Sequence, residues 1–281
     1  MPPDAVKPTP PVPAAAWGLA TLQRWRLQAR QAAEVLLATL ELLALATTRA
    51  AYAPPRSTAL AQHLLRNTWP QLPGFAVLAA LLGLVLIRIV VVTAHSYGLS
   101  QYALEMVVRV LVLELLPLLA ALFVALRCSL PMADEVAHRL HQTAPAAPQP
   151  GDDAALRLRW LADEVLPRAL AVWFSVWLLV AVSALLTLVL AYGLVYGPTP
   201  WGWPAYTHMV GRVFTPVVLV VFAVKTLAFS LAVGVVPLAS VAAQWPRRHL
   251  PPNRATELQG LVRMTGVLLV VEVLSLVGNY H

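Results

Sequence analysis

The chain has 281 residues, of which 59% are hydrophobic and 12% are charged, and its mean hydropathy is +0.71. Soluble domains carry about 25% charged residues, so this composition excludes an ordinary soluble domain and indicates a polytopic membrane protein. The formal net charge of +7 then reflects orientation or contact with anionic lipids rather than nucleic-acid binding. The single cysteine, Cys128, excludes an intramolecular disulfide framework, and the histidines show no paired ligand spacing, so no metal site is predicted.

The N-terminal quarter of the chain is predicted to precede the membrane spans. Residues 1–13 are rich in proline and have no apolar period, which predicts a disordered or extended tail without the apolar core of a cleavable signal peptide. Residues 14–71 are predicted to be an interfacial helical region. It holds an amphipathic helix over about 14–51 and a short segment over 57–69. An ordinary helix between solvent and core is the alternative for the first of these.

Five apolar stretches are long enough to cross a bilayer, so the fold class is all-α, with a five-span membrane domain over 72–281. A basic segment containing the loop 143–153 separates the second span from the third, and residues 138–166 are predicted to be a cytoplasmic linker. The predicted spans cover about 72–94, 102–126, 167–194, 209–243 and 258–277.

The loops between the spans differ in charge. Arginines are concentrated in the N-terminal region, in 127–168 and in 247–254, whereas the other two loops have none. The positive-inside rule therefore places the N-terminus in the cytoplasm, and five spans place the C-terminus on the outer side. The aromatic residues of the loop 196–206 suit the outer membrane interface.

Four short motifs occur in a fixed order along the chain. The stretch 113–137, Pro167-Arg168, the stretch 224–230 and the stretch 253–256 resemble, in this order, motifs of the MlaE (YrbE-type) permease family. The first stretch resembles three family motifs in turn, R-E-L-G-P, A-L-L-x-A-G-R-x-G-S and A-x-E-I-G. Without a gap, it matches them at Glu114, Pro117, Ala121, Leu122, Ala125, Arg127 and Glu135. The family's cytoplasmic coupling segment, T-E-Q-I-D-A-L, is replaced by His141-Gln142-Thr143 and a proline-rich linker.

This resemblance implies a permease subunit of a lipid-transporting ABC system in the bacterial inner membrane. The expected partners are an ATPase subunit, a periplasmic MCE-domain protein, membrane lipids and a second permease chain. The second permease would form a homodimer or, given the replaced coupling segment, a heterodimer. No directly bound cofactor and no catalytic residue is expected, since ATP would be hydrolysed on the partner. The alternatives are a non-transporting scaffold subunit, and a polytopic lipid-modifying enzyme, for which the acids and histidines form no nucleophile–base constellation.

Charged residues inside the spans are the candidate site residues. Glu114 and Lys225 both fall near mid-depth, where each needs a partner, so they are predicted to pair. The pair either lines the lipid path or locks the helix bundle. Arg88, Arg109 and Glu272 are placed nearer the outer leaflet, either as an outlet that binds the lipid phosphate, or as snorkelling arginines with Glu272 paired to one of them. The residues predicted on the cytoplasmic, ATPase-facing side are Arg127, Glu135, Arg139, Arg168 and Arg254.

Overall fold

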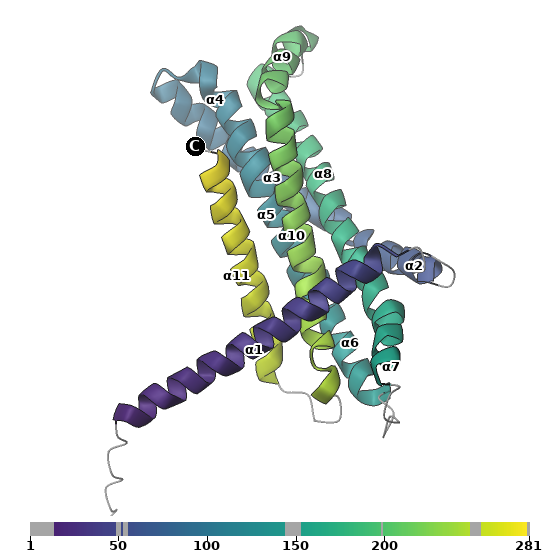
Figure 1. Cartoon of the computed structure of the whole chain (residues 1–281). Coiled ribbons are helices and arrows are strands. Elements are labelled where there is room, and N and C mark those ends of the chain that lie inside the picture. Colours follow the sequence, from purple (N-terminus) through teal and green to yellow (C-terminus); the bar gives the residue numbers. More distant parts are fainter. Residues whose placement is uncertain are drawn as a thin grey trace, which may run out of the picture.

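The structure is a computed structural model that describes residues 14–48, 52, 56–143, 153–197, 199–247 and 254–279. Within these ranges the chain folds into helices, with no strand, which confirms the predicted all-α class. Long helices run side by side as a bundle, and α1 (Ala14–Ala46) lies obliquely across one end of it (Figure 1). We call this the α1 end of the bundle. The short helix α2 (Arg56–Thr68) follows α1.

Five helical stretches of the described chain are long and apolar enough to cross a membrane, as predicted. The second and third are longer than predicted, because each continues beyond its apolar part as a more polar helix at the α1 end, α6 (Leu130–Thr143) and α7 (Asp153–Trp160). The five stretches are Gln71–Ser96, Tyr102–Gln142, Asp153–Tyr196, Pro216–Ala242 and Gly260–Gly278. The first is the helix α3, the fourth is the helix α10, and the fifth lies within α11 (Arg254–Asn279).

The predicted fourth span, 209–243, begins too early. Residues up to Val213 belong to a separate helix, α9 (Trp203–Val213), which lies at the end of the bundle opposite α1 (Figure 1). The chain breaks after it, and α10 restarts at Pro216 with Thr215 as its N-cap. The Thr215 hydroxyl accepts a hydrogen bond from the Val218 amide at 3.4 Å. A threonine cap followed by proline is a strong helix start, and it overrides the apolar continuity of the sequence.

Proline shapes the two longest helical stretches. The second stretch contains, in chain order, the helix α4 (Ser100–Val107), the π-helical turn η2 (Val108–Leu115), the helix α5 (Leu116–Val124) and the π-helical turn η3 (Ala125–Ser129). The third stretch contains the π-helical turn η4 (Leu161–Val165), which is followed by α8 (Leu166–Tyr196). Each π turn ends two residues before a proline, at Pro117, Pro131 and Pro167. Proline lacks an amide hydrogen and clashes with the carbonyl four residues earlier. A locally widened helix accommodates that clash without a sharp kink.

The centre of the bundle is the contact between α8 and α10. At Gly234 a side chain would come within 3.0 Å of the Ala169 carbonyl oxygen and 3.3 Å of the Trp173 amide, so any larger residue would push the two helices apart by a few tenths of an ångström. Phe229 on α10 is fully buried nearby in the main apolar core. Helix α1 joins a second core at its own end of the bundle through Val35, Ala38 and Leu42. These contacts hold α10 as the shared wall of both cores.

Candidate functional site

Three charged side chains from three helices meet inside the bundle. The Lys225 ammonium, on α10, donates a hydrogen bond to the Glu114 carboxylate in the π turn η2. It also lies 2.9 Å from the Glu272 carboxylate on α11. We call Glu114, Lys225 and Glu272 the acidic triad, because one ammonium faces two carboxylates. With all three groups ionised, the charges +1, −1 and −1 sum to −1.

The acidic triad is almost completely shielded from solvent. The side chains of Lys225, Glu114 and Glu272 are only 2%, 10% and 15% exposed. The ring of Phe229, one turn along α10, lies 5.6 Å from the Lys225 ammonium and adds a cation–π contact. Charges at this depth need partners, since an isolated one costs roughly 2.5–3.5 kcal/mol on insertion scales.

The two carboxylates are held differently. Glu114 accepts a directional hydrogen bond, whereas the near Glu272 oxygen is close enough for an ion pair but has no hydrogen bond of acceptable angle. Glu114 also lies in the π turn that precedes Pro117, where the widened helix changes which side chains face inward. Lys225 is therefore a residue that connects α11 to the helix carrying Glu114.

The triad partly matches the sequence-based expectations. The contact predicted between Glu114 and Lys225 is present. Glu272 contacts Lys225 rather than Arg88 or Arg109, the pairing that is one of the two alternatives for these three residues. Arg109 instead contacts Glu105, one turn earlier, at 3.1 Å and is 54% exposed, and Arg88 is exposed on α3. Glu272 therefore lies with Lys225 because α11 packs against α10, a contact that sequence spacing could not reveal.

A second ionic network lies at the α1 end of the bundle. Arg168, only 3% exposed, contacts Glu164 at 2.6 Å and Glu135 at 3.9 Å. The half-exposed Arg139 contacts the same two acids, at 2.7 Å to Glu135 and 3.5 Å to Glu164. We call Glu135, Arg139, Glu164 and Arg168 the interfacial network. Glu164 was missed by the sequence reasoning, although its position four residues before Arg168 is the spacing of a helical ion pair.

The remaining residues predicted for the cytoplasmic side do not join this network in the described structure. Arg127 is exposed on η3, and the side chain of Arg254 lies outside the described residues. His63, on α2, is close enough to the interfacial network to feel its charges. Burial, and then the Arg168 guanidinium, lower the pKa of His63, against the opposing effects of Glu135 and Glu164.

Comparison with known proteins identifies the family of the chain. Residues 60–243 match the family described as Permease MlaE, a range that covers more than half of the 281-residue chain. The matched range includes Glu114, Lys225 and the interfacial network, whereas Glu272 lies beyond its end. No match was found among curated proteins. The chain therefore belongs to the MlaE permease family, as a multi-pass membrane protein of the permease type.

Proposed function

We propose that the chain is the membrane-spanning subunit of a lipid-transporting ABC complex in the bacterial inner membrane, with its N-terminus in the cytoplasm. Family membership supports a permease subunit of a lipid ABC transport system. In the proposed complex a separate ATPase subunit hydrolyses ATP, a periplasmic MCE-domain protein receives or delivers the lipid, and a second permease chain completes the membrane part. This chain binds no cofactor itself.

The observation that carries the proposal is the acidic triad. Three charges buried among apolar helices are costly, so they are expected where the membrane part changes state rather than where it is simply packed. Lys225 has two alternative acceptors on different helices, so α11 can move relative to η2 while the ammonium keeps one partner. We propose that lipid passes beside the triad and that this exchange accompanies the opening of the path.

The proposed partner chain follows from the segment between α6 and α7. Helix α6 ends at Thr143 and α7 begins at Asp153, and the sequence between them does not contain the family's coupling motif. A heterodimer would let a second permease receive the force from the ATPase. Co-purification tests this directly, since a complex with two copies of this chain and no other permease would refute the heterodimer.

Transport by the reconstituted complex tests the role of the triad. Glu114→Ala and Lys225→Ala are each expected to reduce lipid transfer strongly while the complex still assembles. Glu105→Gln is the matched control, because Glu105 is an acid of the same helical stretch whose partner, Arg109, is largely exposed. Wild-type transfer by both triad variants would refute the proposed path.

The same measurement addresses the second candidate function, a scaffold that anchors the complex without moving lipid. The replaced coupling segment is the observation that favours it. A scaffold predicts that the triad variants leave transfer unchanged, and that removal of the chain abolishes assembly. A permease predicts loss of transfer from an assembled complex.

A further inference from the structure

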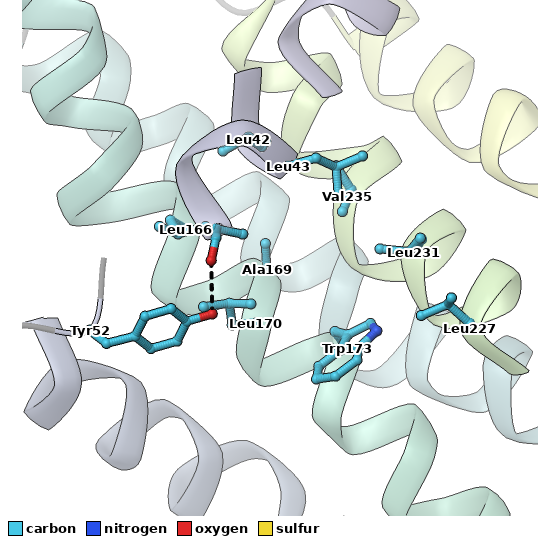
Figure 2. A pocket seen from close by; sticks show the side chains of 11 residues that line it. Leu42, Leu43, Tyr52, Leu166, Ala169, Leu170, Trp173, Leu227, Leu231 and Val235 are labelled. Atoms are coloured by element: carbon cyan, nitrogen blue, oxygen red, sulfur yellow. Dashed lines mark hydrogen bonds between the residues drawn. The ribbon is translucent and has the colours of Figure 1, made fainter. Parts of the chain in front are cut away.

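An apolar pocket of about 330 Å³ lies beneath α1. Figure 2 shows that its walls come from the last turns of α1, the first turns of α8 and the middle of α10. Water's share of liquid volume is about 30 Å³, so the pocket has room for roughly ten water-sized groups. The principal lining residues are Leu42, Leu43, Leu170, Trp173, Leu227 and Leu231.

The lining offers little for a polar ligand. Besides aliphatic side chains it contains Trp173 and Tyr52, and the Tyr52 hydroxyl already donates a hydrogen bond to the Ala46 carbonyl at 3.0 Å (Figure 2). The indole nitrogen of Trp173 is buried and has no hydrogen-bond partner, so it adds no accessible donor. A lining of this kind favours apolar molecules over polar ones.

The surface of α10 indicates which apolar molecule this is. One face of the helix, at spacings of three and four residues, runs from the exposed outer surface into the pocket. Val217, Val220 and Val224 on this face are 73%, 62% and 59% exposed. Exposure then falls to 40% at Leu227, at the mouth of the pocket, and to 6% at Val235, at its floor. The face that would meet lipid therefore continues directly into the pocket.

The outer surface of α1 also fits a lipid environment. Leu36, Leu37 and Leu40 are 59%, 60% and 53% exposed on the helix that roofs the pocket, beside the fully buried Ala38 and Leu42. A helix with apolar residues on both its inner and outer sides is embedded among acyl chains rather than in water. Acyl chains packed around α1 therefore lie next to the pocket that α1 covers.

We infer that this pocket holds one acyl chain of a membrane phospholipid, from the leaflet at the α1 end of the bundle. The chain lies along α10 between Leu227 and Val235 and fills the space between α1 and α8. It seats α1 on the bundle as a resident lipid, separate from any lipid that passes the acidic triad. Binding depends on the acyl chain, since the pocket presents no charged group to a headgroup. The inference goes beyond transport and holds whether or not the complex moves lipid.

Photo-crosslinking of the full chain in nanodiscs tests the inference. The probes are phosphatidylethanolamine and phosphatidylglycerol that carry a diazirine on one acyl chain. Adducts are expected to concentrate on peptides containing Leu42–Ala46 and Leu227–Val235, with equal yield from both headgroups. Leu231→Trp is expected to lower these adducts about fivefold or more, because the indole occupies the space of the acyl chain.

Control variants keep the result interpretable. Leu185→Trp adds the same indole at a site on α8 that is 66% exposed and outside the pocket, and it should leave the adducts unchanged. Leu227→Trp obstructs the 40%-exposed mouth instead of the interior, so it blocks entry even if Leu231→Trp fails to fold. The inference is overturned if both pocket variants crosslink like Leu185→Trp. It is equally overturned if the adducts have the mass of a peptide, which would identify a protein segment as the occupant.

Discussion

The acidic triad and the interfacial network contain the same kinds of side chain at two depths. In the triad, one lysine serves two acids from three separate helices, and every member is at least 85% buried. In the interfacial network two arginines share two acids, and Glu135 and Arg139 are each about half exposed. Solvent can replace a lost partner at Glu135 and Arg139, but not at the buried Arg168 or in the triad. We therefore expect burial, more than the number of ionic contacts, to decide what each contact contributes to stability.

The largest expected effect comes from removing the shared cation. Lys225→Met removes the ammonium that the buried carboxylates of Glu114 and Glu272 share, which we expect to cost about 3–5 kcal/mol of unfolding free energy. Reversible unfolding in mixed micelles measures this. Arg139→Met is the matched control, because its acids keep Arg168 as a partner. Equal losses for the two variants would remove the distinction between the regions.

Removing Glu114 or Glu272 singly should lower the unfolding free energy less than Lys225→Met does, because Lys225 keeps the other acid as a partner. Glu114→Gln is expected to cost about 1.5–3 kcal/mol, the range for a hydrogen bond to a charged group. Glu272→Gln should cost less, since Glu272 lacks the directional bond. The double variant leaves the ammonium alone and should lose more than the sum of the single losses. Additive losses would show that the two acids act independently of Lys225.

Within the interfacial network, burial should separate the two arginines. Arg168→Met removes a guanidinium that is 3% exposed, and we expect a loss of about 1–3 kcal/mol. Arg139→Ala removes one that is half exposed, and we expect a loss of only about 0.2–1 kcal/mol that shrinks further at high salt. Unfolding at low and high ionic strength measures both. A larger loss for Arg139→Ala would contradict the depth argument.

The smallest effect concerns pH. Because the folded protein lowers the pKa of His63, the unfolded chain binds a proton at His63 more readily. Stability is therefore expected to fall as pH drops below about 6.5, the ordinary histidine value, towards the lower folded pKa. In a plot of unfolding temperature against pH, His63→Gln should flatten the part of the curve below about pH 6.5. The control, His138→Gln at an exposed position, should leave the curve unchanged. An unchanged profile in His63→Gln would show that another group causes the acid loss.

The features that could be predicted from the sequence are those that local composition decides. Long apolar stretches have to form helices in a bilayer, because their backbone groups find no water there. Hence the all-α class and the five spans followed from hydropathy alone. The contact between Glu114 and Lys225 was also predictable, since two opposite charges near mid-depth each require a partner.

Other features depended on which helices became neighbours. The sequence groups Glu272 with Arg88 and Arg109 because they are predicted at a similar depth, but depth along a helix does not show which neighbouring helix a side chain faces. The contact between Glu272 and Lys225 depends on the packing of α11 against α10. The break at Thr215 and Pro216 was hidden by continuous hydropathy. The pocket beneath α1 likewise exists only because three distant segments converge.

The sequence by itself thus determined that the described chain has five helices long and apolar enough to cross a membrane, and that it carries buried charges that must be paired. Both are properties of short segments and of the cost of polar groups in hydrocarbon. Tertiary structure alone decided that Lys225 serves two acids, that Arg168 is buried while Arg139 is not, and that α1 covers an apolar space. These features depend on distances between helices, which are set by side-chain packing such as the close approach at Gly234.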